Sequence, residues 1–320
     1  MTAVMAIKFD ANDPLSALGI GEPIAFDAPP GWVKVRPVAG SINHHDLWSL
    51  RGVGLLADQL PIVLGTDAVA ITETGDRVLV YPIVIESSNH ELGAAGVSLL
   101  SEKFPGTFAD ELFVPEANLI PLPPEISDEE AGCLSTAWLT AYRMLTTQAN
   151  LQEGQTVLIQ GAGGGVSNAA IVLARALGAT VWVTSRSPEK RARALQIGAT
   201  AVFEPNVRLP GFADVVIETV GEATWAHSLK AVKTGGVIVV SGATSGSEPS
   251  ADLRRVFRRQ IRIQGSSMGT PFEMSELVQL LIRTGARPVV AAIYPREAAR
   301  EAFARFLSGD FFGKIVLTAD

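Results

Sequence analysis

The chain has 320 residues, of which 47% are hydrophobic, and a formal net charge of −7. A chain of this length and composition buries a core in each of about two domains, which excludes a disordered protein. The negative charge argues against a general nucleic-acid or anionic-membrane binder, because both surfaces attract positive charge. A small-molecule substrate is therefore expected, with no nucleic-acid and no membrane partner.

The single cysteine, Cys133, excludes an internal disulfide and a multi-cysteine metal site, and it fits a reducing compartment. The first ten residues contain no apolar stretch of signal-peptide length. One charge-free run, Gly154 to Ala174, contains polar and glycine residues that are costly in lipid, so we interpret it as strand, loop and buried helix. A cytoplasmic location is expected.

The first third of the chain has the pattern of short antiparallel strands. Hydrophobic and polar residues alternate from Trp32 to Val38, and Gly75-Asp76-Arg77 predicts a turn that enters a strand at Val78–Val80. A proline-rich linker, Pro121–Pro124, comes next. Ser127 and Glu130 then form the pattern of a capping box, which predicts that a helix begins there.

From Gly154 onward, apolar runs alternate with helical patterns. Helical spacing relates Val166, Ala170, Leu173 and Leu177. Continuous β-branched runs indicate strands buried on both faces, as in a doubly wound parallel sheet. The runs are Val157–Ile159, Val181–Val183, Ala201–Phe203, Val215–Ile217, Val237–Val240 and Ile261–Ile263. Lys314–Leu317 is expected to be a closing strand.

A glycine-rich loop joins the first of these runs to the following helix. Its residues are Gly161, Ala162, Gly163, Gly164, Gly165 and Val166, followed by Ser167 at the place of the last glycine of the strict fingerprint. Glycines allow backbone N–H groups to approach a pyrophosphate, and the helix N-terminus adds a partial positive charge. Strand, loop and helix in this order predict dinucleotide binding rather than a purely structural turn.

The residues after the second run distinguish NADPH from NADH. NAD-specific sites usually carry a carboxylate there for the ribose hydroxyl, whereas this chain has Ser185 and Arg186, then Lys190, and no carboxylate before Glu189. Arg186 suits a 2′-phosphate, with Ser185 and Lys190 adding a donor and a charge, so NADPH is favoured. The alternative is that Arg186, Lys190 and Arg191 form only a solvated basic helix start.

These residues, together with several motifs, resemble the medium-chain dehydrogenase/reductase superfamily, in particular its zinc-free quinone oxidoreductase-like branch. Besides the glycine loop, the motifs are Ser41–Leu47, Leu64–Asp67, Gly75–Val78, Gly106–Ala109, Leu139–Tyr142 and Gly313–Val316. The resemblance implies an α/β protein with a GroES-like antiparallel β catalytic domain, residues 1–137 and 270–320, and a Rossmann NADPH-binding domain, residues 138–269.

The resemblance also bears on zinc. Zinc-bearing members place Cys, His and Cys ligands where this chain has Asn43, Thr66 and Thr136. Zinc sites in proteins use thiolate, imidazole and carboxylate ligands in a tetrahedral array, and Asp67 alone does not supply one. No metal is therefore expected, and Cys133 is interpreted as a packing residue. Adjacent His44 and His45 rarely face one ion, so a substrate-side role for one histidine is the alternative to packing.

By the same resemblance, Asn43 is the best donor near the nicotinamide, with His44 and Thr66 as further catalytic candidates. Trp48 and Tyr81, with Leu55 and Leu92, are expected to line the substrate pocket. The remaining residues implied to line the cofactor cleft are Thr140, Gly242, Ala243, Thr244, Ser266, Met268 and Lys314, each of which has turn or packing chemistry as its alternative.

The function that these observations predict is zinc-independent transfer of hydride from NADPH to a quinone or an α,β-unsaturated carbonyl. A conjugated acceptor delocalises the charge that hydride addition creates, so it needs less help than an isolated ketone. Two alternatives stay open, a zinc-free alcohol or aldehyde dehydrogenase and a non-catalytic NADPH-binding sensor. The resemblance implies a homodimer through the edge strand Ile261–Ile263.

Overall fold

The computed structural model describes residues 2–85 and 96–319. The chain divides into two compact units: Met1–Thr136 with Thr270–Ile282 and Pro288–Asp320, and Ala137–Gly269 with Arg283–Arg287. Residues 283–287, which the expected boundaries assign to the catalytic domain, thus cluster with the second unit. No helix in the part of the chain that the structure describes has the length and apolarity to cross a membrane.

The first unit is built on a mixed sheet of seven strands. The strand order is β10-β6-β5-β3-β18-β17, with β9 also pairing with β3. The pairs that β3 makes with β5, β9 and β18 are antiparallel, whereas β17 and β18 are parallel. The strands of this sheet are β3 (Trp32–Ser41), β5 (Val69–Thr72), β6 (Arg77–Val80), β9 (Leu112–Pro115), β10 (Leu119–Pro121), β17 (Val290–Pro295) and β18 (Lys314–Thr318).

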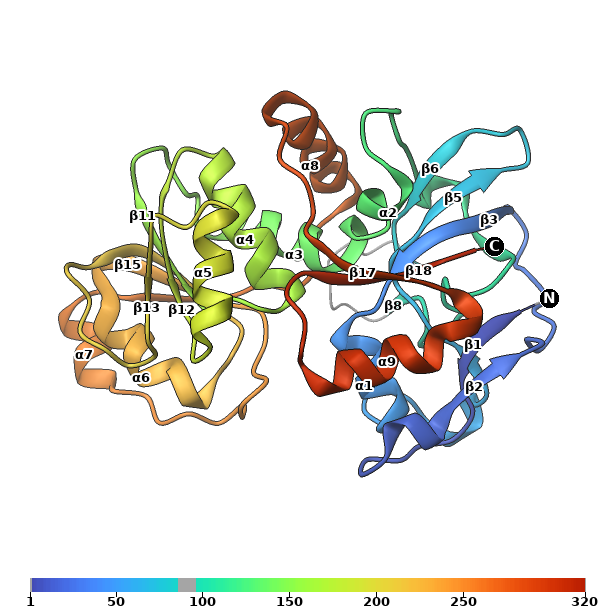
Figure 1. The fold of residues 1–320 in the computed structure, drawn as a ribbon, viewed down its shortest axis with the longest axis horizontal. Coiled ribbons are helices and arrows are strands. Elements are labelled where there is room, and N and C mark those ends of the chain that lie inside the picture. The colour runs from blue at the N-terminus through green and yellow to red at the C-terminus, as the bar shows by residue number, and fades with distance from the viewer. Residues whose placement is uncertain (1, 86–95, 320) are drawn as a thin grey trace. The chain divides into compact units, whose positions relative to one another are not determined.

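In the described residues of this unit, two smaller sheets and four α-helices accompany the large sheet. The strands β1 (Ala3–Ala6), β2 (Leu18–Gly21) and β4 (Ile62–Val63) form one sheet, and β7 (Ile83–Ile85) with β8 (Val97–Leu99) forms the other. The helices are α1 (His44–Leu50), α2 (Asp128–Ala131), α8 (Pro271–Thr284, in this unit up to Ile282) and α9 (Ala299–Ser308). Helix α9 packs beside β17 and β18 (Figure 1), and Phe303 and Phe306 from its apolar face join the core that contains Leu317.

The predicted antiparallel region and the predicted start of a helix are both confirmed. Gly75 adopts a φ of +91° in the turn before β6, a conformation that glycine reaches without a steric cost. The hydroxyl of Ser127 accepts from the Glu130 amide, and the Glu130 carboxylate accepts from the Ser127 amide. This capping box opens α2, because it gives two otherwise unpaired amide groups an acceptor.

The second unit contains a parallel sheet of six strands in the order β13-β12-β11-β14-β15-β16. All its strand pairs are parallel. The strands are β11 (Thr156–Gln160), β12 (Thr180–Thr184), β13 (Ala201–Phe203), β14 (Ala213–Glu218), β15 (Val232–Val240) and β16 (Arg262–Gly265). In chain order this is the 3-2-1-4-5-6 arrangement of a doubly wound Rossmann sheet, so the predicted fold class is confirmed.

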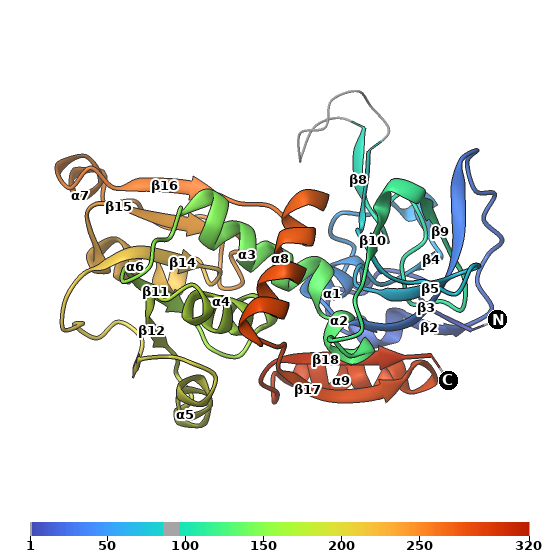
Figure 2. The same ribbon diagram turned by 90° about the horizontal axis from the view of Figure 1, so that it is seen from above.

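The α-helices of the second unit follow its strands, except α3, which precedes β11. They are α3 (Leu139–Arg143), α4 (Gly165–Ala176), α5 (Pro188–Gln196), α6 (Glu222–Ala231) and α7 (Leu253–Arg258). Strands β11, β14 and β15 are the buried centre of the sheet, where Ile159, Ile217 and Val239 are fully enclosed. At the other extreme β16 is an exposed edge strand, which Figure 2 shows beside β15 and α7. The strand begins at Arg262, one residue later than the predicted run, and the preceding Ile261 is buried.

Candidate functional site

The glycine loop leads directly from β11 into the N-terminus of α4. Gly161 turns the chain with a φ of +86°, and Gly164 is the N-cap of the helix. The side chains of the first helical turn bond to the loop's carbonyl groups: Asn168 Nδ2 donates to Ala162 O at 2.6 Å, and Ser167 Oγ donates to Gly164 O at 3.0 Å. The loop is thereby held with its helix-start amides available to an anion. Sequence reasoning missed Asn168.

Lys190 lies over this loop. A Cβ atom built at Gly163 would come within 2.8 Å of Lys190 Nζ, so a side chain at Gly163 would force the ammonium group away. Lys190 is placed by the start of α5, where its backbone N–H donates to the Ser187 hydroxyl at 3.1 Å. A cation of α5 thus lies beside the glycine loop within this unit.

The other two cations of this segment differ in their surroundings. Arg191 Nη1 donates to the Ser185 carbonyl at 2.6 Å, and its Nη2 lies 3.4 Å from Glu204. Arg191 therefore braces the backbone after β12. Ser185 is buried and Arg186 is exposed, and the Arg186 guanidinium has no hydrogen-bond or ion-pair partner within residues 2–85 and 96–319.

A cavity of about 280 Å³ lies at the carboxyl ends of β14, β15 and β16. Ligands of open α/β sheets bind at this edge. Gly242 and Ala243, two of the expected cofactor residues, line it together with Glu218 and Trp225. The Trp225 indole N–H is buried and has no partner among the described residues.

The other expected cofactor residues of the second unit lie on three segments. Thr244 N–H donates to Thr219 O at 3.4 Å, and Ser266 N–H donates to Val240 O at 2.8 Å, which continues the β15–β16 pairing. Met268 is half-buried. Thr140 is buried on α3.

A buried polar network joins β14 to α6. Glu218, at the end of β14, accepts from the Val220 and Gly221 amides and from the hydroxyls of Thr224 and Ser228. Ser228 in turn accepts from Gln160 Nε2 at 3.0 Å, at the end of β11. The sequence analysis did not identify Glu218. The signal that could have identified it is a carboxylate directly after the apolar run Val215–Ile217.

In the first unit, Asn43 belongs to a buried cluster around Lys314. Lys314 Nζ donates to Asn43 Oδ1 at 2.5 Å and to Ile42 O at 3.0 Å, and it lies 3.4 Å from Asp67 Oδ2. Lys314 is 3% exposed and Asp67 is fully buried. The resemblance implied a cofactor contact for Lys314. In the structure, these three oxygen atoms can accept all three N–H donors of its ammonium group.

The amide group of Asn43 is also engaged. Its Nδ2 carries two protons and has three acceptors within reach, Asp67 Oδ2 at 2.9 Å, Ser41 O at 3.2 Å and Thr66 Oγ1 at 3.3 Å. The Thr66 hydroxyl lies 2.9 Å from the hydroxyl of Thr136. The three positions at which zinc-bearing members place ligands are thus joined into one hydrogen-bonded chain.

The histidines beside this cluster have different environments. The His44 ring lies against Phe306, with 5.0 Å between the ring centroids. Loss of hydrating water and then the positive charges of Lys314 and Arg51 lower the pKa of His44 below its usual value, so its ring is neutral at neutral pH. His45 Nε2 instead pairs with Glu102 at 3.1 Å.

Asp46 organises the turn that carries Asn43. Its carboxylate accepts from the Asn43 and Gly65 amides, each at 2.8 Å. Burial raises the pKa of Asp46. In the described part of the chain, no group of three histidine, cysteine or acidic side chains is arranged to hold a metal ion.

The expected pocket residues have contrasting exposures. Trp48 is 41% exposed, whereas Tyr81 is 1% exposed and sits in the core. Leu55 is buried, and Leu92 lies outside the described residues. Cys133 is fully buried, and burial raises the pKa of its thiol to about 12, in keeping with a packing role.

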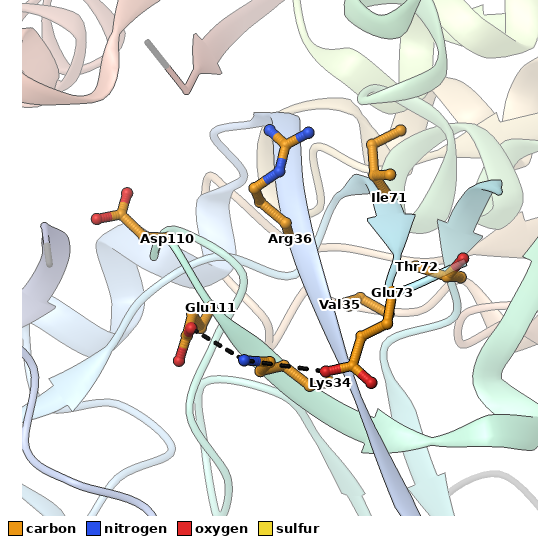
Figure 3. Close-up of a pocket in the computed structure, with 8 residues that line it drawn as sticks. All are labelled: Lys34, Val35, Arg36, Ile71, Thr72, Glu73, Asp110 and Glu111. Carbon is orange, nitrogen blue, oxygen red and sulfur yellow. Dashed lines mark hydrogen bonds and ion pairs between the residues drawn. The ribbon is translucent and has the colours of Figure 1, made fainter. Parts of the chain in front are cut away.

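A second hollow, of about 380 Å³, lies over β3 and β5 (Figure 3). Lys34 Nζ lies there between Glu111, at 3.3 Å, and Glu73, at 3.9 Å. None of the predicted site residues lines this hollow, so it carries no part of the candidate site.

Comparisons with known proteins agree with the fold. Residues 29–124 match the model of the alcohol dehydrogenase GroES-like domain, and residues 165–283 match that of the zinc-binding dehydrogenases. The chain is 30% identical over 308 residues to acryloyl-coenzyme A reductase of Metallosphaera sedula, covering 89% of this chain and 91% of that protein.

Two further relatives are similar over their whole lengths. A zinc-type alcohol dehydrogenase-like protein of Schizosaccharomyces pombe is 28% identical, with 99% of this chain and 100% of that protein covered. A solved NAD-dependent alcohol dehydrogenase superposes with a TM-score of 0.90 at 29% identity and full coverage of both chains. The chain therefore belongs to the medium-chain dehydrogenase/reductase superfamily of oxidoreductases.

Proposed function

We propose that this oxidoreductase uses NADPH, without zinc, to reduce a quinone or an α,β-unsaturated carbonyl compound. The observation that carries the proposal is the set of positive groups around the glycine loop. Lys190 lies over Gly163, Arg186 is exposed after β12, and no carboxylate occupies the place of an NAD-selecting acid.

The residues present fit such a dinucleotide. The amides from Gly161 to Val166 would hold its pyrophosphate at the start of α4, while Ser185, Arg186 and Lys190 would hold a 2′-phosphate. When bound, the dinucleotide supplies a hydride. The protein's own contribution is to orient the two reactants, exclude water and stabilise the charge that develops on the substrate.

The substrate class follows from the polar groups available. In place of metal ligands the chain has Asn43, Thr66 and Thr136, which are joined by hydrogen bonds. Hydrogen bonds suffice most readily when the charge is delocalised, as in an enolate or a phenolate. The name of the Metallosphaera sedula relative specifies an acryloyl group, which is a conjugated acyl group of the proposed kind.

A zinc-free alcohol or aldehyde dehydrogenase is the second candidate. It is favoured by the similarity to an NAD-dependent alcohol dehydrogenase over the full length of both chains. This candidate predicts cofactor reduction by alcohols and no reaction with quinones. A preference for NADH would also favour it.

Replacement of Arg186 tests the choice of cofactor. We expect Arg186→Ala to raise the dissociation constant for NADPH about 10- to 150-fold, because a hydrogen bond to a charged group is worth about 1.5–3 kcal/mol. The affinity for NADH should stay unchanged. Nucleotide fluorescence titration measures both values. Arg175→Ala, at an exposed arginine in the last turn of α4, is the matched control.

An unaltered ratio of the two affinities in Arg186→Ala would remove Arg186 from the proposal.

The reaction is tested by following NADPH absorbance with quinones, enones and aldehydes, with and without a chelator. Chelator-resistant oxidation by quinones or enones is expected. Tight binding without turnover of any acceptor would instead indicate the non-catalytic sensor.

A further inference from the structure

We infer that Thr136 is the residue that donates a hydrogen bond to the negatively charged oxygen of the substrate. The inference rests on the proposed function and adds a catalytic residue to it. The sequence comparison marked Thr136 only as a position without a zinc ligand. In the structure Thr136 ends a chain of donors that begins at the buried ammonium of Lys314.

The first step is the orientation of the Asn43 side chain. Lys314 Nζ can only donate, so the Asn43 atom that faces it at 2.5 Å is the carbonyl oxygen. The NH₂ group must then face the opposite way, toward Asp67 and Thr66. Lys314 is therefore a positioning residue, since it decides which end of the amide meets Thr66.

The second step is the direction of the two hydroxyl groups. Among the described residues, Thr66 Oγ1 has two polar neighbours, Asn43 Nδ2 at 3.3 Å and Thr136 Oγ1 at 2.9 Å. The Asn43 NH₂ group can only donate, so Thr136 Oγ1 is the atom that can accept the proton of the buried Thr66 hydroxyl. The Thr136 hydroxyl accepts that bond, so its proton points away from the cluster. Asn43 and Thr66 are buried, whereas Thr136 is half-buried, so of the three residues only Thr136 has substantial exposed surface.

The third step is the chemistry. Hydride adds to a carbon conjugated with the carbonyl group, the displaced π electrons move to the carbonyl oxygen, and a proton from water completes the reduced product. Thr136 loses no proton and keeps its O–H bond throughout. It donates a hydrogen bond that strengthens as the oxygen becomes negative, and preorganised donors of this kind act mainly on the transition state.

Replacement of Thr136 by valine preserves its shape and removes the donor. We expect Thr136→Val to lower kcat about 100-fold, as for the loss of one oxyanion donor, with an unchanged dissociation constant for NADPH. Thr136→Ser should restore most of the rate. Thr318→Val is the matched control, a half-buried threonine of the same unit, and should retain the wild-type rate.

A second variant reverses the donor chain while it leaves Thr136 in place. Asn43→Asp puts a carboxylate where the NH₂ group faces Thr66, so Thr66 must donate to it and Thr136 must donate to Thr66. We expect kcat to fall at neutral pH and to recover at acidic pH, because protonation of the new carboxyl between Asp67 and Lys314 restores a donor. A loss of rate that is independent of pH would indicate a structural defect and would count against the inference.

Binding of 4-nitrophenol, with and without NADP⁺, gives a measurement that is independent of turnover. Wild-type protein should lower the pKa of the bound phenol, as followed by phenolate absorbance, and Thr136→Val should abolish this shift. Failure of every acceptor with wild-type protein would overturn the proposed function, while the phenol titration would still decide the role of Thr136. An equal phenol shift in wild type and Thr136→Val, or an equal kcat, would overturn the inference.

Discussion

At the scale of single residues, the partners of a buried side chain decide its protonation state. His227 is 5% exposed on α6. Its Nδ1 accepts from the amide of Gln160 at 3.0 Å, and its Nε2 donates to the Val207 carbonyl at 2.9 Å. This arrangement specifies a neutral ring with its proton on Nε2, because Nδ1 faces a donor. Burial lowers the pKa of His227.

This lowered pKa predicts how stability varies with pH. Below pH about 6.5 the unfolded chain binds a proton at His227 that the folded chain does not bind, so the free energy of unfolding falls as the pH falls. The slope reaches about 1.4 kcal/mol per pH unit for one such group. His227→Gln should flatten the dependence in urea titrations below pH about 6.5.

Between about pH 7.5 and 8.5 the His227 group is neutral in both states, and the two proteins should show parallel curves there. His44, whose pKa is also lowered, leaves a residual slope of the same sign in the variant. Curves that stay parallel down to acidic pH would show that His227 is not the group responsible.

At the scale of elements, the junction of β14 and α6 depends on one carboxylate. Glu218 is fully buried. Its carboxylate accepts hydrogen bonds from the amides of Val220 and Gly221 in the turn, and from the hydroxyls of Thr224 and Ser228 in the helix. A buried carboxylate is tolerable only when donors replace its hydration. The same group lines the cavity at the carboxyl ends of the strands, so the network fixes the shape of that cavity.

We expect Ser228→Ala to lower the free energy of unfolding by about 2–3 kcal/mol, because it removes the 2.6 Å donor to Glu218 and an acceptor for Gln160. Urea denaturation followed by circular dichroism measures the change. Ser308→Ala, at an exposed serine whose hydroxyl, among the described residues, bonds only to Arg305 O and the Asp310 amide nearby in the chain, should change the value by less than about 0.5 kcal/mol. Equal effects of the two substitutions would contradict the role given to the network.

At the scale of the whole molecule, the second unit has one exposed sheet edge at β16. All four residues of β16 are exposed, and Ile263 is 46% exposed. An unprotected edge strand with an apolar residue offers unpaired N–H and C=O groups to a second strand. We propose that two copies of the chain pair through β16 across a two-fold axis, as the resemblance implied.

Ile263→Lys tests this pairing. Two lysines would face each other near the axis, and the charge would favour a monomer. Light scattering after size exclusion should report a dimer for wild-type protein and a monomer for the variant. Ile24→Lys, at an exposed isoleucine of the first unit, is the matched control and should remain dimeric. A dimeric Ile263→Lys protein would reject β16 as the interface.

The sequence alone determined the local elements and their class. The apolar runs at Val157–Ile159 and Val215–Ile217 are strands of a parallel sheet, since continuous β-branched residues suit strands covered on both faces. The glycine loop lies between strand and helix as predicted. These features are readable because each depends on neighbours close in sequence. Helix α4 differs in detail. Of the predicted apolar stripe, Ala170 and Leu173 are buried, whereas Val166 is half-buried and Leu177 is the half-buried C-cap. The buried face also includes Ser167 and Asn168.

Only the tertiary structure decided which side chains meet. Lys314 and Asn43 are 271 positions apart, yet their side chains are in contact. No periodicity or spacing encodes such a pair, because it depends on β18 pairing with β3. This pairing gave Asn43 hydrogen-bond partners inside the protein. It also placed Thr136 at the open end of the chain of donors, a role that the identity of a threonine does not reveal in the sequence.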